Sequence, residues 1–195
     1  MSKRSSRRLG FGLALLIAPP LAGAQTSAGS AREKPDARVA AFEVALYNAQ
    51  ANQQEASDSA KAALATRILQ TKLAELLPGQ VVDAAALRSA TRAPGALASA
   101  QRQPCNVIVA CARAVAGATG ARWVVMAKVS KTSNLIWLLT GQLVHVPSGA
   151  IILDDSTELK GEPEAMVRAG TRIFAERAAR TVRAGGVTTD FPDVP

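Results

Sequence analysis

The spacing of hydrophobic residues in the first half of the chain predicts a strand followed by a long helix. Residues 39–46, "VAAFEVAL", favour a strand whose even positions share one face. These positions are Ala40, Phe42, Val44 and Leu46. A helix is predicted from Ser57 or Asp58, either of which is a suitable N-cap, to Leu77, because Pro78 and Gly79 end it. Its apolar stripe consists of Leu64, Ile68, Leu69, Leu73, Leu76 and Leu77.

The middle of the chain predicts shorter elements. Residues 80–83, "QVVD", favour a short strand, and residues 84–91 favour a small helix. Pro94-Gly95 and Pro104 indicate a loop region that contains Cys105. A further helix is predicted over residues 111–119, with Gly120 as its C-cap.

The last third carries the strongest pattern, three strands and a helix. Strands are predicted over residues 122–130, 135–146 and 150–159, and a final helix runs from about 163 to 183. In the third of these strands Ile151, Leu153 and Leu159 should share one face, and Asp154, Ser156 and Glu158 the other. The final helix should turn Met166, Gly170, Ile173 and Phe174 toward the sheet.

This order predicts one α/β domain over residues 38–184, followed by a loose tail over 185–195. The order is strand, helix, strand, helix, helix, strand, strand, strand, helix, and it favours a mixed sheet of about five strands. The last three strands, with short connections, should form an antiparallel meander. The first two strands, separated by a helix, should pair parallel if they are adjacent. Trp123 and Trp137 lie on strands and are expected in the core.

The first 24 residues have the three parts of a secretory signal peptide. The basic start holds Lys3, Arg4, Arg7 and Arg8, an apolar run follows over 9–18, and Ala22-Gly23-Ala24 fits the cleavage site. The mature chain would begin at Gln25, with residues 25–37 as a flexible lead-in. A retained membrane anchor is the alternative, although the apolar run is short and ends at Pro19-Pro20. We therefore predict a periplasmic protein with no membrane span after cleavage.

Loss of the signal changes the charge of the chain. The full sequence has 23 basic and 15 acidic residues, a net charge of +8. Removing four basic residues leaves nineteen against fifteen, so the net charge falls to about +4. This mild excess, with few aromatic residues to stack on bases, argues against nucleic acid as a partner.

The two cysteines of the mature part, Cys105 and Cys111, predict a disulfide bridge. An even number of cysteines in an exported chain favours pairing, and two free thiols are the alternative. A metal site is not predicted, because two cysteines and the distant His145 do not complete a tetrahedral set.

The sequence predicts no catalytic residue and no cofactor. His145 has no nucleophile beside it in the sequence and is interpreted as a half-exposed strand residue. Asp154 and Asp155 would point to opposite faces of a strand and so would not converge on one proton or metal. No dinucleotide fingerprint, zinc spacing or calcium loop is present.

Two surface features remain as candidate binding sites. Lys131, Thr132, Ser133 and Asn134 interrupt two apolar runs and form either a turn between strands or a loop that a partner uses. Five arginines, at positions 168, 172, 177, 180 and 183, crowd the final helix. They form a solvated face or, alternatively, a surface for an anionic partner or lipid.

Several segments together resemble a known family. These are "RVAAFEVALYNA", "ATRILQTKLAELLPGQVVD", "CARAVAGATGARWVV", "KTSNLI" and "VPSGAIILDDSTELKG", which cover about residues 38–180. They resemble small secreted bacterial proteins defined by a domain of unknown function and often encoded near periplasmic quinoprotein alcohol dehydrogenases. The matching positions are Cys111, Ala116, Gly120, Ala121, Ser133, Asn134, Leu135 and Ile136. The order of elements also resembles small α/β domains of envelope accessory proteins, such as the N-terminal domain of the Tol-system translocation protein, as a fold analogy only.

The resemblance favours a non-catalytic periplasmic accessory or protein-binding domain. It would present the 131–136 hairpin to an unidentified periplasmic protein, such as an oxidoreductase or an envelope complex. One alternative is a small-ligand-binding protein or a hydrolase-type enzyme, with a site between the cysteine loop and the meander. Another is an envelope-surface binder that uses Arg168, Arg172, Arg180 and Arg183.

Overall fold

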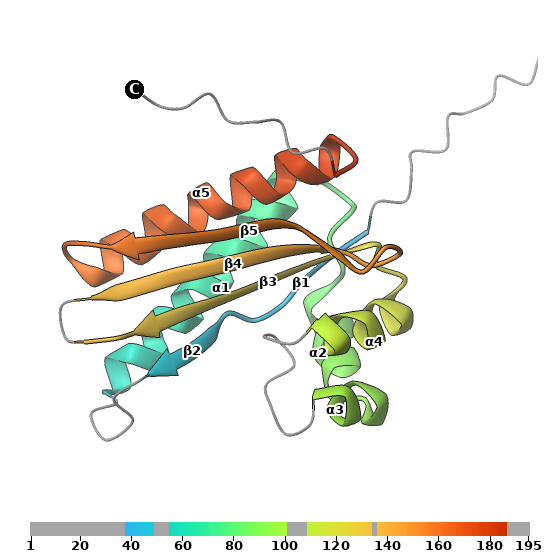
Figure 1. The fold of residues 1–195 in the computed structure, drawn as a ribbon, viewed down its shortest axis with the longest axis horizontal. Helices are drawn as coiled ribbons and strands as arrows, with labels where there is room; N and C mark the ends of the chain where they lie inside the picture. Colours follow the sequence, from blue (N-terminus) through green and yellow to red (C-terminus); the bar gives the residue numbers. More distant parts are fainter. Residues whose placement is uncertain (1–37, 49–54, 101–108, 134–135, 187–195) are drawn as a thin grey trace, which may run out of the picture. The chain divides into compact units, whose positions relative to one another are not determined.

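Strand β3 (Trp123–Lys131) lies at the centre of a five-stranded mixed sheet (Figure 1). Its apolar residues are buried on both faces, as expected of a central strand covered by two layers. Strand β4 (Trp137–His145) pairs antiparallel with β3, and β5 (Ala150–Leu159) pairs antiparallel with β4. On its other side β3 pairs parallel with β1 (Val39–Ala41) and β2 (Ala45–Asn48). The predicted mixed sheet and antiparallel meander are therefore confirmed.

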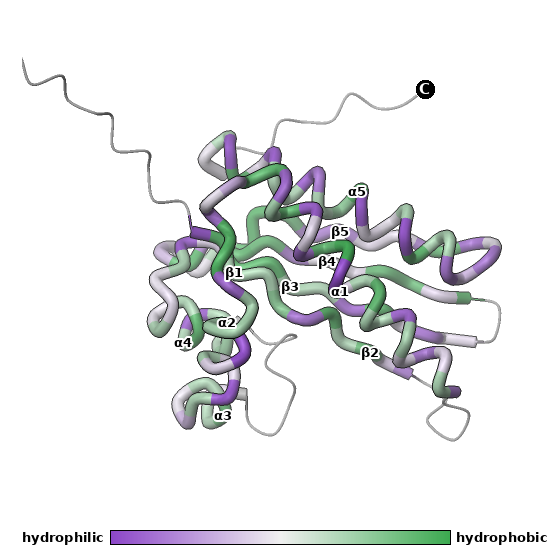
Figure 2. The backbone as a smooth tube through the Cα atoms, turned by 180° about the vertical axis from the view of Figure 1, so that it is seen from behind, coloured by the Kyte–Doolittle hydropathy of each residue, from purple (hydrophilic) through white to green (hydrophobic). Residues whose placement is uncertain are grey.

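Helices cover both faces of this sheet in the computed structural model, which describes residues 38–48, 55–100, 109–133 and 136–186. One face packs against α1 (Ala56–Leu76) and α5 (Pro163–Arg183), and the other against α2 (Ala84–Thr91), α3 (Pro94–Ala100) and α4 (Val109–Thr119). Figure 2 shows hydrophobic and hydrophilic positions alternating along α1 and α5, as expected of helices with one buried face. The predicted signal peptide, the lead-in and residues 187–195 lie outside the described residues.

The prediction of one continuous first strand is wrong, because an extra residue divides it. Ala41 lies opposite Val125 and Ala45 opposite Lys128, so three residues of the first segment face two of β3. Such a bulge reverses the side-chain alternation. Phe42 consequently packs with α2–α4, whereas Val44 packs with α1 and α5. The four even positions do not share one face.

A second register shift occurs in the β4–β5 pair. Leu143 lies opposite Leu153, but its neighbour Val144 lies opposite Ile151. The extra residue turns Ile151 away from the face that carries Leu153 and Leu159, and Ile151 is exposed. The prediction that these three residues share a face is therefore wrong for Ile151.

Helix α1 begins earlier than predicted. Its N-cap is Glu55, and Asp58 occupies the third helical position, where it accepts a hydrogen bond from the backbone N–H of Glu55 at 3.1 Å. The assignment of Ser57 or Asp58 as N-cap is corrected accordingly. The apolar stripe is buried at Leu64, Leu69, Leu73 and Leu77, and partly buried at Ile68 and Leu76.

The segment between α1 and β3 is more helical than predicted. Val81 forms only an isolated parallel bridge with Val39, so the predicted second strand is reduced to one residue. That residue pairs parallel with the first strand, as predicted. Residues 94–100 form α3 in place of the predicted loop. Proline suits the first position of a helix, where its missing N–H has no partner to lose. The prediction for α2 is confirmed. Helix α4 starts two residues before its predicted start and ends at Thr119, and Gly120, which follows it, has a φ of 67°.

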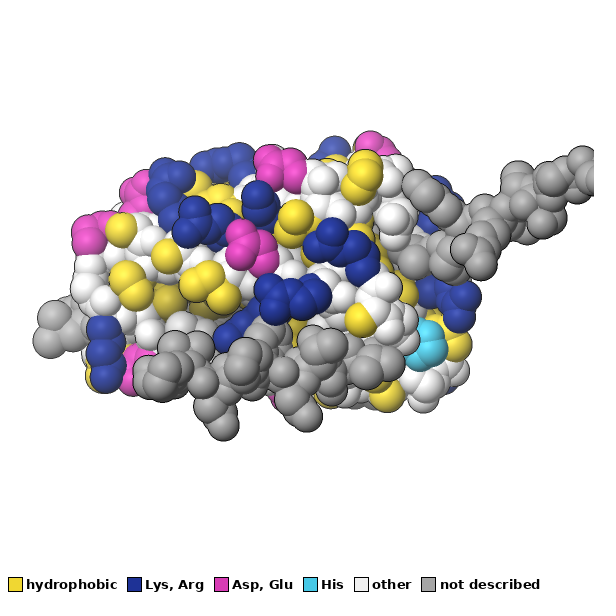
Figure 3. Space-filling model, turned by 90° about the horizontal axis from the view of Figure 1, so that it is seen from above, with side chains coloured by type: hydrophobic (Ala, Val, Ile, Leu, Met, Phe, Trp, Pro, Cys, Tyr) yellow, Lys and Arg dark blue, Asp and Glu magenta, His cyan; other side chains and the backbone are white. Residues whose placement is uncertain are grey.

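Helix α5 packs its aromatic residue onto a glycine of the sheet. Glu162 caps the helix by accepting hydrogen bonds from Glu164 N and Ala165 N at 3.0 and 2.6 Å. Phe174 lies over Gly141 of β4, where a Cβ atom would overlap its ring. Ile173, predicted to face the sheet, is 47% exposed, so that prediction is wrong. On the face seen from above in Figure 3, Lys and Arg side chains gather among exposed apolar ones.

Candidate functional site

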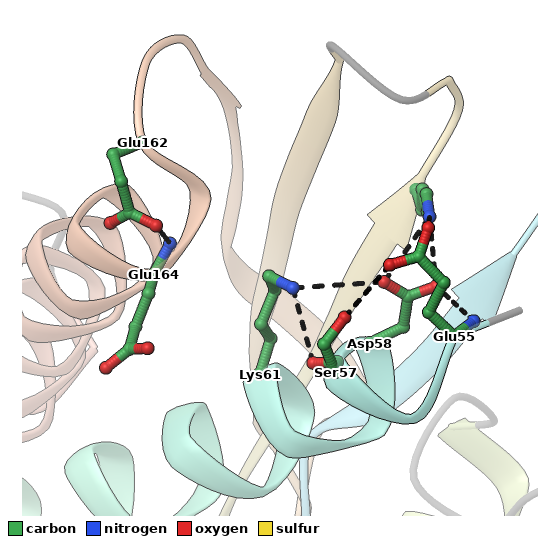
Figure 4. A network of polar contacts seen from close by, with 7 residues as sticks. Glu55, Ser57, Asp58, Lys61, Glu162 and Glu164 are labelled. Carbon is green, nitrogen blue, oxygen red and sulfur yellow. Dashed lines mark hydrogen bonds and ion pairs between the residues drawn. The ribbon is translucent and has the colours of Figure 1, made fainter.

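The end of the β3–β4 hairpin is tied to the start of α1 by a buried ion pair. Lys131 is 3% exposed and Asp58 is 1% exposed. The Nζ of Lys131 donates to Asp58 Oδ2 at 3.1 Å and to Oδ1 at 3.4 Å, and it lies 3.6 Å from Glu55 Oε1. Figure 4 shows Glu55, Ser57, Asp58 and Lys61 gathered at the first turn of α1. The hairpin and the helix are therefore held in one fixed arrangement.

Local structure explains why the two charges meet. Lys131 is the last residue of β3, and in register it lies between Asn48 of β2 and Trp137 of β4. Asp58 is fixed on the first turn of α1 by its hydrogen bond to the backbone of Glu55. A carboxylate is favoured at this helix end, because the unpaired backbone N–H groups carry partial positive charge.

The indole ring of Trp137 lies close to two ammonium groups. The Nζ of Lys61 lies 5.0 Å from the ring centroid of Trp137, and that of Lys131 lies 5.7 Å from it. Lys61 also lies 3.9 Å from Asp58 Oδ1 and donates to Ser57 O at 3.3 Å. The cluster thus combines two cations, two carboxylates and one aromatic face that attracts the cations.

The electrostatics of the cluster keep Lys131 charged. Burial disfavours the ammonium form and by itself lowers the pKa of Lys131. The hydrogen bond and negative charge of Asp58, together with Glu55, outweigh burial, so the pKa of Lys131 lies above its ordinary value. A charged, paired lysine anchors the hairpin and is not suited to act as a nucleophile or proton acceptor.

Beyond this anchor, a short hydrogen-bond network closes the tip of the hairpin. Thr132 donates to Ile136 O through both its backbone N–H and its hydroxyl, each at 3.0 Å. Ser133 Oγ accepts from Ile136 N at 3.0 Å. Thr132 and Ile136 are exposed, and Ser133 is partly exposed. The tip can therefore present hydroxyl groups and an apolar side chain from a fixed base.

The structure divides the four predicted binding residues. Lys131 is buried and contacts residues at the start of α1, whereas Thr132 and Ser133 lie at the tip. Asn134 lies outside the described residues. The sequence interpretation missed Glu55, Asp58 and Lys61, for which the start of a helix was the only local signal.

His145 takes part in a turn and in aromatic packing. Its Nδ1 lies 2.9 Å from Ser148 Oγ, which also accepts from Ala150 N, and its ring lies 4.6 Å from that of Trp123 between centroids. Within the described residues it has no carboxylate partner. The contacts place His145 in the β4–β5 turn, half-buried as the sequence interpretation expects.

The neighbouring carboxylates Asp154 and Asp155 diverge, as the sequence predicts. Arg177 of α5 donates to both oxygens of Asp155, at 2.8 and 2.7 Å, while Asp154 is exposed. In the part of the chain that the structure describes, no group of three or more His, Cys, Asp or Glu residues is placed to hold a metal ion. In the same part, no helix is both long and apolar enough to cross a membrane.

The predicted disulfide involves one described residue. Cys111 is fully buried in α4, and its Sγ lies 3.3 Å from Ala96 O of α3. Cys105 lies outside the described residues, so the bridge stays a prediction.

The arginines of α5 differ in their contacts. Arg168 pairs with Glu164 at 2.7 Å, and Arg177 pairs with Asp155 on the sheet side. Arg172, Arg180 and Arg183 are exposed. The interpretation of a solvated face therefore fails for Arg177, which is partly buried.

Comparison with solved structures finds distant likenesses. The C-terminal domain of LpoB from Salmonella enterica has a TM-score of 0.45 and 18% identity, covering 65% of this chain and 84% of that one. The PelC dodecamer from Paraburkholderia phytofirmans (space group P6) has a TM-score of 0.42 and 15% identity, covering 75% and 86%. TolB from Acinetobacter baumannii has a TM-score of 0.42 and 15% identity, covering 76% and 28%. Similarity at this level carries no argument about function.

Comparison with families is more specific. A search of curated proteins found no significant match. Nothing in the matches supports an association with quinoprotein alcohol dehydrogenases, which stays a prediction. The family model DUF3280, described as "Protein of unknown function (DUF2380)", matches residues 37–178. Because this match covers most of the sequence, the chain belongs to that family.

Proposed function

We propose that the chain is a secreted, non-catalytic periplasmic accessory protein that binds another protein through the tip of the β3–β4 hairpin. It would be exported by a signal peptide cleaved after Ala24 and would support a periplasmic oxidoreductase or an envelope complex. The observation that carries the proposal is the buried Lys131–Asp58 pair beneath an exposed tip.

A buried ion pair is an expensive way to stabilise a fold. Removing two charges from water costs about as much as their attraction returns, so an apolar pair of the same volume would serve stability as well. Such a pair does, however, require one defined geometry. At the base of the hairpin it fixes the direction of the tip, and a preorganised loop loses less entropy when it binds.

The surface around the tip has the composition of a protein-binding patch. Ile136 is 43% exposed at the tip, and Tyr47 of β2, opposite Ser130, is 58% exposed at the same end of the sheet. Tyrosine is among the residue types enriched at interface centres. The tip residues Thr132 and Ser133 add hydroxyl groups, which suit the polar rim of such an interface.

Site-specific photocrosslinking in the native cell tests this function. A photoreactive amino acid replaces Thr132 at the tip, or Arg92 at the end of α2 as a control; both residues are exposed. We expect one predominant protein adduct from position 132 and none of the same mass from position 92. Equal adducts from both positions, or adducts only from position 92, would contradict binding through the tip.

A further inference from the structure

A groove separates the outer surfaces of α1 and α5, on a different part of the domain from the hairpin tip. Its volume is about 410 Å³. Leu64 and Ile68 of α1 give it apolar walls, and basic side chains come from both helices: Arg67 and Lys72 from α1, Arg168 and Arg172 from α5. An adjoining hollow of about 250 Å³ shares Leu64, Arg67 and Arg168, so the depression continues toward the first turns of both helices.

Two of the basic groups in this groove are not neutralised. Lys72 pairs with Glu75 at 3.0 Å, and Arg168 pairs with Glu164 at 2.7 Å. Arg67 and Arg172 have neither an ion pair nor a side-chain hydrogen bond within the described residues. One guanidinium from each helix therefore faces the groove with its donors unused, beside an apolar wall.

We propose that this groove binds an acidic segment of a partner protein. Carboxylates of that segment would pair with Arg67 and Arg172, because the planar guanidinium donates two parallel hydrogen bonds to a carboxylate. An apolar side chain between the carboxylates would pack on Leu64 and Ile68. This site is independent of the function proposed for the hairpin.

The groove is concave and has an apolar wall and one arginine from each helix. This combination favours a peptide over a membrane surface. An anionic bilayer attracts basic residues wherever they protrude, so it would engage Arg180 and Arg183 as well as the groove. It does not require a hollow with an apolar wall between two cations. On the face seen from above in Figure 3, apolar side chains are exposed between Lys and Arg side chains.

Selection from a displayed library of random short peptides tests the proposal without a known partner. The purified full chain is the target, and the Arg67→Ala/Arg172→Ala variant is used for counter-selection. We expect the retained peptides to contain Asp or Glu on both sides of an apolar residue. The affinity of a retained peptide, measured by fluorescence anisotropy, should fall at least about tenfold in the double variant, since two charge-assisted contacts are lost.

A matched double variant separates the groove from general charge. Arg92→Ala/Arg183→Ala removes the same charge from two exposed positions outside the groove, and it should change the affinity less than about twofold. Circular dichroism confirms that both variants are folded.

Four results would overturn the proposal. The first is that the retained peptides lack acidic residues, and the second is that both double variants lose affinity equally. Phosphatidylglycerol vesicles bind, whereas no acidic peptide does, which assigns the arginines to a lipid surface. Peptides bind only after residues 187–195 are removed, which assigns the groove to the chain's own acidic segment around Asp190 and Asp193.

Discussion

Lys131 and Asp58 are 73 residues apart in the sequence, yet their charged atoms lie 3.1 Å apart in the interior. The pair connects the end of the central strand to the first turn of α1. It fixes the base of the hairpin whose tip we propose as a binding surface. Its removal should therefore affect both stability and binding, whereas changes at the tip should affect binding alone.

Loss of Asp58 should destabilise the domain strongly. In Asp58→Ala the ammonium of Lys131 stays buried without its closest partner and keeps only the more exposed Glu55 at 3.6 Å, so the melting temperature should fall by roughly 5–10 °C. Differential scanning calorimetry measures the change. The control is Glu75→Ala, which breaks the exposed Lys72–Glu75 pair and should shift the melting temperature by no more than about 2 °C. Similar shifts in both variants would contradict a structural role for the buried pair.

The raised pKa of Lys131 predicts a loss of stability at alkaline pH. Because the folded-state pKa exceeds the ordinary value of 10.5, the pair's full contribution is present below that pH and is lost as pH rises through the folded value. The free energy of unfolding, measured with urea, should fall more steeply with rising pH in the wild type than in Lys131→Met. The variant has no group to titrate at position 131. Parallel declines would mean that the pair does not couple proton binding to folding.

Gly141 should not tolerate a side chain. Gly141→Ala places a methyl group against the ring of Phe174, and the resulting overpacking should cost about 1–3 kcal/mol of unfolding free energy. Gly117→Ala in α4 is the matched control, because no atom lies within 4 Å of its added Cβ and alanine favours helix. Chemical denaturation should show the first variant weakened and the second unchanged or stabilised. An unchanged free energy of unfolding in Gly141→Ala would contradict the packing of Phe174 on Gly141.

The exported protein should be processed and oxidised. Its intact mass should correspond to a chain that begins at Gln25 and is lighter by two hydrogen atoms, owing to a Cys105–Cys111 bridge. Non-reducing mass spectrometry of the mature protein measures both properties at once. A product that begins at Met1 contradicts export with cleavage, and alkylatable thiols contradict the bridge.

Periodicity predicted the regular part of the fold. The apolar runs along residues 122–146, the alternation along 150–159 and the helical spacing along 163–183 each persist over many residues, so the meander and α5 were predictable. The split of the first strand was not, because a bulge changes the face without changing the composition. Helix α3 was missed because its opening Pro94-Gly95 is also typical of a turn.

The candidate site was harder to predict than the fold. Lys131 was identified as part of a polar turn, but its partner lies on a helix far away in the sequence, and an ion pair between distant segments leaves no local pattern. The N-cap was misplaced because serine and aspartate are the stronger capping residues, whereas here Glu55 precedes the helix and Asp58 pairs back to it.

The central claim, that the hairpin tip binds a protein, is tested most directly by the variant Asn134→Ala. Melting temperature and partner crosslinking from position 132 are measured on the same preparation. We predict a melting temperature within about 1 °C of wild type, because the proposal gives Asn134 a role in binding and none in packing, together with a clear loss of the adduct. Equal loss of stability and crosslinking, or an unchanged adduct, would contradict the claim and reduce the tip to a turn between two strands.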